Sequence, residues 1–414
     1  MAIVRPFKAV RPNESKVDKV ASLPYDVMNR EEAEKMAEGN PLSFLHVVRS
    51  EMDVPKEVSQ YDESVYLKAR ENLDRFQEEG TLIQDEKPMF YIYRQIMDGR
   101  AQTGFVGCTS IDDYMNDVIK KHEFTLPKKE VDRINNFNHC DANTAPIFLT
   151  YRDDAELQSI LDNWTEGNKP VYDFVSEDGI SHIVWVITED SINVRVNEIF
   201  AGIDYLYIAD GHHRSASSVK VGMKRREDNP NFTGDEEFNF FMSVIFPESH
   251  LYIMDYNRVV EDLNGQTKEE FLANVEKSFT VEKMDNRYHP ESKYNYGLYL
   301  DGSWYKLSAK EESFDKKHPV NSLDAAIVQN NLLDPVLGIE DPRKSQRIHF
   351  VGGIRGLEEL ESLVDSKQYQ VAIALFPVKM TDIMDVADNG EIMPAKSTWF
   401  EPKLRSGLFV HKLS

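Results

Sequence analysis

Short apolar runs alternate with amphipathic stretches along this chain, which is the pattern of strands and helices mixed in one fold. Residues 2–7 and 88–96 have the apolar character of strands, and residues 103–110 follow an Asp-Gly turn as a hairpin partner. Residues 63–79 repeat apolar positions at helical spacing, and Asn29 is a good N-cap for the polar helix after it. We therefore expect an α+β fold (mixed α/β) with short, partly antiparallel strands.

The same alternation continues to the end of the chain. An apolar strand at 205–209 ends in Asp-Gly, before a helix that is expected to begin at Arg214. A polar stretch after residue 262 marks a soft boundary, so we expect an N-terminal region (1–262) and a C-terminal region (263–414) whose basic tail docks on the functional site. Further strands are expected at 144–151, 171–175, 182–188, 240–245 and 370–376, and further helices at 155–163, 269–278, 323–333 and 380–387.

Charge and composition narrow the classes of function. The 414 residues carry a formal net charge of -23, which would repel nucleic acid and anionic membranes over most of the surface. We find neither the apolar run of a signal peptide nor a run of 18 apolar residues, which indicates a cytoplasmic protein that acts on small molecules. Cys108 and Cys140 are too few for a disulfide framework or a cysteine-rich zinc site, and no metal-ligand set is expected.

The segment Ile208-Ala-Asp-Gly-His-His-Arg-Ser215 carries the strongest chemical signal. A strand gives way through a glycine to a helix N-terminus, where unpaired N–H groups and the helix dipole favour an anion. Gly211 permits close approach of the backbone, Arg214 offers a planar fork for phosphate oxygens, and Ser215 supplies a hydroxyl group. The sequence therefore predicts a phosphate-binding turn.

Three polar residues of the same segment are candidates for catalysis. Asp210, at the end of the strand, would orient a histidine or help to hold a divalent metal through water, and His212 and His213 would act beside it. The alternative is a structural turn in which Asp210 caps the helix and the histidines are ordinary polar surface. Four polar side chains, these three and that of Arg214, lie at one junction between a strand and a helix, which favours the functional interpretation.

A second segment, residues 119–133, is dense in charge of both signs. Glu123 is a candidate general base and His122 a candidate proton carrier. The alternative is a solvated helix face with ion pairs at i,i+4 spacing. The cations that would bind an anion here are Lys121, Lys128 and Arg133.

A third segment, residues 393–409, concentrates positive charge and hydroxyl groups in a strongly acidic protein. Two prolines and a glycine indicate a defined backbone, and the aromatic pair Trp399-Phe400 could anchor the loop or stack on a base. The alternative is a basic tail packed on an acidic surface. The candidate ligands for phosphate or nucleotide are Lys396, Ser397, Thr398, Lys403 and Arg405.

These segments, taken in order, resemble a known family. The motifs Leu23-Pro-Tyr-Asp-Val, Lys121-His-Glu, Ala209-Asp-Gly-His-His-Arg, Gly338-Ile-Glu-Asp-Pro-Arg and Lys396-Ser-Thr-Trp-Phe-Glu-Pro-Lys-Leu-Arg-Ser-Gly are similar to those of the domain of unknown function 1015 family. The Asp-Gly-His-His-Arg motif also resembles the phosphate-binding signature of the ParB and sulfiredoxin-like fold, which includes kinases of free L-serine. This resemblance implies a small mixed sheet core, with additional α/β segments, that holds nucleotide phosphates.

The resemblance implies a nucleotide-dependent kinase of a small hydroxyl metabolite in serine metabolism, with ATP or ADP as donor and Mg²⁺ bound through the phosphates. Tyr25 and Asp26 would contact the substrate, and the general base is either Glu123 or Asp26. Sulfiredoxins carry a catalytic cysteine where His212 stands, so sulfinic-acid reduction is not expected. The alternatives are a ParB-like nucleotide-binding regulator without small-molecule turnover, or a phosphoester hydrolase.

The distribution of the basic residues along the chain leads to one geometric prediction. Cations that gather in short segments of an acidic chain are best explained if each neutralises part of one polyanionic ligand. We therefore expect Asp210–Ser215, Lys121–Glu123 and Lys396–Arg405 to line one cleft.

Overall fold

The structure, a computed structural model, describes residues 1–125 and 127–414, and its chain divides into two compact units. The first unit contains residues 1–121, 125–251 and 402–414, and the second contains residues 122–124 and 252–401. The boundary suggested near residue 262 thus falls inside the second unit, and residues 402–414, here called the returning segment, belong to the first unit. In the described residues, no helix is long and apolar enough to cross a membrane.

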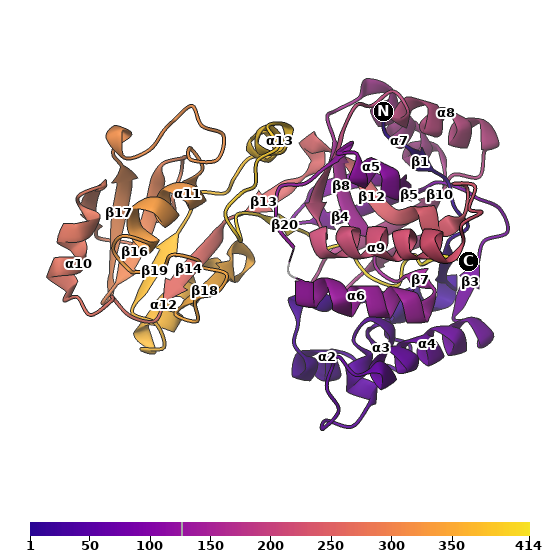
Figure 1. The fold of residues 1–414 in the computed structure, drawn as a ribbon, viewed down its shortest axis with the longest axis horizontal. Helices are drawn as coiled ribbons and strands as arrows, with labels where there is room; N and C mark the ends of the chain where they lie inside the picture. The colour runs from indigo at the N-terminus through magenta and orange to yellow at the C-terminus, as the bar shows by residue number, and fades with distance from the viewer. Residues whose placement is uncertain (126) are drawn as a thin grey trace. The chain divides into compact units, whose positions relative to one another are not determined.

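A mixed sheet forms the centre of the first unit (Figure 1), which agrees with the expected α+β class. Its strands run in the order β6-β11-β8-β12-β5-β4-β10-β9, and β1 pairs with β5. The pairing of β12 is parallel with β8 and antiparallel with β5, so the two strand directions mix within one sheet. The strands are β1 (Val4–Arg5), β4 (Tyr91–Met97), β5 (Arg100–Ser110), β6 (Ile119–Lys120), β8 (Ile147–Tyr151), β9 (Tyr172–Val175), β10 (Ser181–Val186), β11 (Leu206–Asp210) and β12 (Phe240–Pro247).

The predicted hairpin between β4 and β5 is present. Met97 pairs with Arg100, so only Asp98 and Gly99 form the turn. Both turn residues have positive φ, 52° and 78°, which an Asp-Gly pair adopts readily and which matches the twist of the two strands. Residues 102–110 of β5 are buried without interruption, as in a strand that is covered on both faces.

Two groups of helices cover the sheet of the first unit. Helices α6 and α9 lie side by side, and α4 packs on α6 (Figure 1), whereas α7 and α8 pack on each other. The N-cap role of Asn29 is confirmed, since its side chain and that of Glu32 form a capping box. The helices are α1 (Val17–Val20), α2 (Arg30–Met36), α3 (Leu45–Val48), α4 (Glu63–Glu78), α5 (Ile111–Met115), α6 (Pro127–Cys140), α7 (Ala155–Gly167), α8 (Asp190–Phe200) and α9 (His212–Asp228).

The returning segment pairs with residues far earlier in the chain. Its strand β21 (His411–Lys412) is antiparallel to β7 (Ala142–Asn143). Further bridges join Ser406 to Ser22 and Val410 to Val10, which lies in the β2 (Val10–Pro12) and β3 (Leu82–Gln84) pair. The segment is thus fixed along its length by backbone hydrogen bonds.

The second unit has an antiparallel sheet in the order β15-β17-β16-β19-β14-β18. Helix α12 packs against β14, β16 and β19. The apolar segment expected as one helix at 323–333 is α11 followed by a turn of π-helix, Gln329–Leu333. The elements are β13 (Tyr252–Met254), β14 (Tyr256–Val260), α10 (Lys268–Val275), β15 (Phe279–Met284), β16 (Asn295–Leu300), β17 (Ser303–Ala309), α11 (Asp324–Val328), β18 (Ile348–Gly352), α12 (Gly356–Asp365), β19 (Val371–Ala374), α13 (Met380–Asp388) and β20 (Trp399–Glu401).

Candidate functional site

In the strand–turn–helix segment of the first unit, a glycine separates a buried strand from a long helix. Strand β11 ends at Asp210, Gly211 has a φ of 98°, and α9 begins at His212, two residues earlier than the sequence suggested. The N-cap is Gly211, which has no side chain to accept a hydrogen bond from the first turn of the helix. The positive end of the dipole of a 17-residue helix therefore meets the end of a buried strand.

Arg214 is buried beneath this turn rather than presented at its surface. Only 2% of the residue is exposed, and its Nη1 donates to the carbonyl of Pro146. A Cβ placed on Gly211 would lie 3.1 Å from the guanidinium carbon, so glycine leaves the room that Arg214 occupies. Ser215 is also buried and its Oγ donates to the carbonyl of Gly211 at 3.0 Å. Both side chains stabilise the turn, whereas the sequence suggested that both reach a phosphate.

Asp210 is ionised and faces two cations. The Nζ of Lys403, in the returning segment, lies 3.3 Å from its carboxylate, and the Nη2 of Arg214 lies 3.8 Å away. Burial favours the neutral acid, but the positive charges of Lys403 and Arg214 outweigh this effect and hold the pKa of Asp210 well below its usual value. Gln95 of β4 donates to the carbonyl of Lys403 at 2.9 Å, which fixes the backbone that carries this lysine.

The two histidines of the motif have different surroundings. His212 is 5% exposed, and burial lowers its pKa to about 3, although the nearby Asp210 opposes the shift. The imidazole of His212 is therefore neutral at physiological pH and is suited to orienting a neighbour rather than to carrying a charge. His213 is half-buried at the second position of α9, which places it nearer to the surface of the turn.

Glu130 of α6 is a buried carboxylate that the sequence interpretation missed. It pairs with Lys220 and accepts a hydrogen bond from the hydroxyl of Thr125, while Ser217 donates to its backbone carbonyl at 3.1 Å. Burial tends to raise its pKa, but Lys220 and Thr125 lower it below its usual value, with a smaller contribution from His213. Its position, three residues before buried Arg133, is the signal that could have indicated an inward-facing carboxylate.

Tyr25 links the Leu-Pro-Tyr-Asp motif to the same region. The guanidinium carbon of Arg133 lies 3.8 Å from the centre of the buried Tyr25 ring. Burial and the charge of Asp26 raise the pKa of the Tyr25 hydroxyl, and the positive charges of Arg133 and Arg214 oppose that rise. Tyr25 thus lies within the electrostatic reach of the Arg214 guanidinium, whereas Asp26 is exposed.

The remaining predicted cations are held by local partners. Lys121 pairs with Asp117 at 2.6 Å and donates to the carbonyl of Tyr114. Lys128 lies above the ring of Tyr61, with 4.6 Å between its Nζ and the ring centre. These contacts are local, and an anion-binding role for the two lysines stays a prediction.

Several predicted residues belong to the second unit. Buried His122 and half-buried Glu123 group with it, as do residues 396–398. Lys396 is exposed, with its Nζ 5.7 Å from the centre of the Tyr256 ring. Ser397 donates to the carbonyl of Pro394 at 2.6 Å, and Thr398 is half-buried.

One part of the predicted shared cleft is present, since Lys403 lies beside Asp210. The rest of the shared cleft stays a prediction.

Arg405 docks on the hairpin of β9 and β10 instead of the turn. Its guanidinium pairs with Asp178 and donates to Ser176 at 3.1 Å and to His182 Nε2 at 3.2 Å. The hydroxyl of Tyr93 lies 2.7 Å from the other ring nitrogen of His182. Burial lowers the pKa of His182 to about 3, and the charge of Arg405 adds to this effect. Arg405 therefore anchors the returning segment two residues after Lys403.

The residues at the turn can be compared with the donors that a magnesium ion requires. In the part of the chain that the structure describes, no three His, Cys, Asp or Glu side chains come together as a metal cluster. Asp210 is the carboxylate at the turn itself, and its partner Lys403 would also approach a bound phosphate. The donor set suits a hydrated ion that is held mainly by phosphate oxygens.

Fold and site together define an α+β protein with an uncapped, glycine-initiated helix at a charged strand end. Residues 4–326, well over half of the chain, match the model of the family described as "Protein of unknown function (DUF1015)". The chain belongs to this family. No curated protein matches its sequence.

Several solved structures resemble this chain, but with low TM-scores and low sequence identities. "SbnI with C-terminal truncation from Staphylococcus aureus" is 13% identical, with 74% of this chain and 86% of that chain covered and a TM-score of 0.40. "Free serine kinase in complex with AMP" is 14% identical, with 72% and 90% covered and a TM-score of 0.36. A "Conserved hypothetical protein from Pyrococcus furiosus" is 12% identical, with 72% and 92% covered and a TM-score of 0.35. Likeness at these scores carries no argument about activity, and a relation to ParB and sulfiredoxin stays a prediction.

Proposed function

We propose that this protein is a nucleotide-dependent phosphotransferase that binds the nucleotide phosphates at the turn between β11 and α9. The observation that carries the proposal is the uncapped N-terminus of α9, with Gly211 at a φ of 98° and the cation of Lys403 at the same strand end. Phosphoryl transfer depends mainly on positioning and on neutralising charge, and these groups supply both. The acceptor is a small hydroxyl metabolite, and the motif resemblance makes free L-serine the first to test.

Each group at the turn has a proposed role. The first N–H groups of α9 hold phosphate oxygens, since Gly211 brings no side chain between them and a ligand. Lys403 contributes positive charge to the phosphate site, and half-buried His213 contributes a hydrogen-bond donor. The first residue comes from the returning segment and the second from α9. Buried Arg214 acts indirectly, by fixing Asp210 and the turn from below.

The general base is proposed to be Asp26, with Glu123 as the alternative. Asp26 is exposed and its charge acts on Tyr25, which lies within reach of the charge of Arg214. Glu130 is a weaker candidate, because Lys220 and Thr125 already occupy its carboxylate. A base needs an oxygen that is free to accept the proton of the acceptor hydroxyl.

Phosphorus NMR tests the proposal directly. The full chain is incubated with L-serine, Mg²⁺ and either ATP or ADP, and phosphoserine is the expected product. Asp26→Asn should abolish turnover but keep nucleotide binding, whereas Asp18→Asn, at another exposed carboxylate of the first unit, should change neither. Absence of phosphoserine with both donors rejects serine as acceptor, and absence of nucleotide binding by calorimetry rejects the whole proposal.

One finding favours a second candidate, a nucleotide-binding regulator without turnover. Among the described residues, the turn has no cluster of metal-binding side chains, and Arg214 is occupied by the carbonyl of Pro146. A site of this kind can hold phosphates without activating them. Tight nucleotide binding that no small hydroxyl compound alters, together with no product, would favour the regulator.

A further inference from the structure

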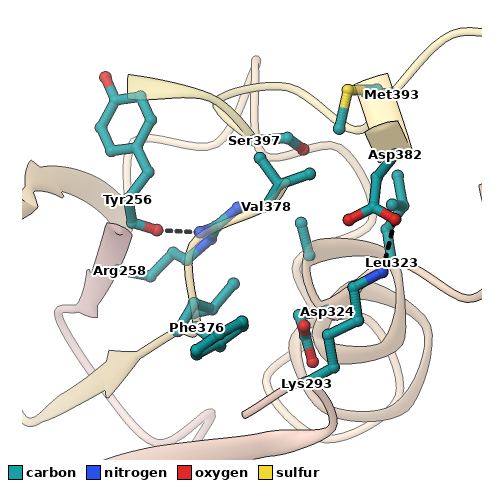
Figure 2. A pocket seen from close by; sticks show the side chains of 12 residues that line it. Tyr256, Arg258, Lys293, Leu323, Asp324, Phe376, Val378, Asp382, Met393 and Ser397 are labelled. Carbon is teal, nitrogen blue, oxygen red and sulfur yellow. Dashed lines mark hydrogen bonds and ion pairs between the residues drawn. The ribbon is translucent and has the colours of Figure 1, made fainter. Parts of the chain in front are cut away.

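A polar pocket in the second unit lies apart from every motif assigned above except Ser397. Its volume is about 350 Å³, which includes space open to solvent. Strand β14, the end of β19 and the starts of α11 and α13 supply its walls, and Figure 2 shows their side chains converging on it. Its charged residues are Arg258, Lys293, Asp324 and Asp382.

Arg258 is a buried cation without an acidic partner. Only 3% of it is exposed, and its guanidinium donates to the backbone carbonyls of Tyr256 and Lys396, the second at 3.1 Å. In the described part of the chain, no carboxylate lies within ion-pair distance of it. Tyr256 and Tyr296 act on its charge, and its guanidinium carbon lies 5.5 Å from the centre of the Phe350 ring. Burial lowers the pKa of Arg258 to about 10, so it remains charged at neutral pH. A buried charge of this kind is costly unless an anion pairs with it.

The other charged groups of the pocket are one ammonium group and two carboxyl groups. Lys293 pairs with Asp382 at 2.5 Å, which neutralises both. Asp324 accepts a hydrogen bond from the backbone N–H of Tyr294 at 2.7 Å, and burial raises the pKa of its carboxyl to about 6. Among the described residues of the pocket, Arg258 is therefore the cation that has no carboxylate partner. A dianion such as phosphate would be repelled by the carboxylates that line the same pocket.

Apart from Tyr256 and Ser397, the rest of the lining is apolar. Leu323, Phe376 and Val378 contribute hydrocarbon surface beside the charged groups. Figure 2 shows Arg258 reaching from β14 toward Val378 and Ser397, with Lys293 and Asp382 on the opposite side. Sites for small molecules commonly have a few polar groups, which orient the ligand, among apolar ones.

We infer that this pocket binds a small carboxylate, with the carboxyl group paired to Arg258 and a short hydrocarbon part against Phe376 and Leu323. A guanidinium matches a carboxylate in shape and can form two parallel hydrogen bonds with it. The nucleotide site of the first unit has no part in this inference. Simple aliphatic acids and α-amino acids share the carboxyl group that Arg258 would bind. Only α-amino acids also carry an ammonium group, which Asp324 could hold.

Titration calorimetry on the full chain tests the inference with propionate, alanine, propionamide and inorganic phosphate. Propionate or alanine should saturate with a dissociation constant in the millimolar range or tighter, and neutral propionamide should not bind. Tighter binding of alanine assigns the pocket to α-amino acids, and tighter binding of propionate assigns it to simple carboxylates. If no carboxylate saturates, or if propionamide or phosphate binds equally well, the inference is overturned.

Variants identify the side chain responsible. Arg258→Met keeps much of the side-chain volume and should weaken carboxylate binding by about tenfold or more. Arg355→Met, at an exposed arginine of the same unit, is the matched control and should bind as the native chain does. Unchanged binding in Arg258→Met would contradict the inference. If that variant does not fold, the comparison of propionate with propionamide on the native chain still decides the question.

Discussion

The Nζ of Lys403 lies 3.3 Å from the carboxylate of Asp210, although 193 residues separate the two along the chain. Their side chains are only 13% and 29% exposed, so the pair is weakly screened by solvent. The returning segment thus completes the charge distribution at the proposed phosphate site. Nothing in the local sequence around Asp210 indicates this lysine.

Replacing Lys403 by Met should weaken nucleotide binding by about tenfold or more, because a poorly exposed cation beside the phosphates is lost. Calorimetric titration with ADP measures the change. Lys224→Met, at an exposed lysine of α9, is the control and should leave the affinity unchanged. Equal affinities in the two variants would exclude Lys403 from the site.

Replacing Gly211 by Ala should destabilise the first unit by about 1–3 kcal/mol, because the residue has a φ of 98°. A new Cβ would also lie 3.1 Å from the Arg214 guanidinium. Gly234→Ala provides the control, since Gly234 has a φ of 101° with open space around its Cβ position. Urea unfolding should show a smaller loss for Gly234→Ala, and nucleotide binding should fall only in Gly211→Ala. Equal losses of stability would mean that the Arg214 contact contributes nothing.

Stability should fall as the pH falls below about 6.5, in part because His182 is buried in a neutral form with a pKa of about 3. The unfolded chain takes up a proton at this histidine from about pH 6.5 downward, while the folded chain does so only near pH 3. Stability is therefore complete above about 6.5 and is lost between those values, by up to about 1.4 kcal/mol per pH unit. Urea unfolding at pH 7 and pH 5 should show a smaller difference for His182→Gln than for the native chain. Exposed His349→Gln should retain the native difference.

Replacing Arg405 by Met should loosen the returning segment, because the contacts with Asp178, Ser176 and His182 are lost. We expect a destabilisation of about 2–4 kcal/mol, since Arg405 is buried and its partners lose a charged donor. Limited proteolysis should then cut within 402–414 faster than in the native chain. Native-like resistance, with native ADP affinity, would show that Arg405 does not position Lys403.

Local patterns predicted most elements but not their distant partners. The β4–β5 hairpin follows from its Asp98-Gly99 turn, and α2 follows from the Asn29 cap, because each depends on neighbouring residues alone. The pairing of β21 with β7 depends on strands about 270 residues apart, as the contact of His411 with Asn143 illustrates, and no local periodicity encodes it.

The direction of the side chains at the turn was harder to predict than the turn itself. An expected helix start at Arg214 implied that Arg214 and Ser215 lie at an open N-terminus. The actual start at His212 rotates both side chains inward, onto the carbonyls of Pro146 and Gly211. A two-residue error in a helix boundary thus exchanges the buried and exposed faces of its first turn.

Residues 252–401 are inserted between two parts of the first unit. During synthesis, the last part of the first unit is therefore made after the whole of this insertion. A ribosome adds about 5–20 residues per second, so Lys403 follows Asp210, 193 residues earlier, by roughly ten to forty seconds. Throughout that interval the nascent first unit has an ionisable carboxyl without its lysine, and β7 has no β21 beside it. The second unit, whose residues emerge in the meantime, can complete its own sheet first. The proposed nucleotide binding at the turn should therefore be among the last properties that the newly made chain acquires.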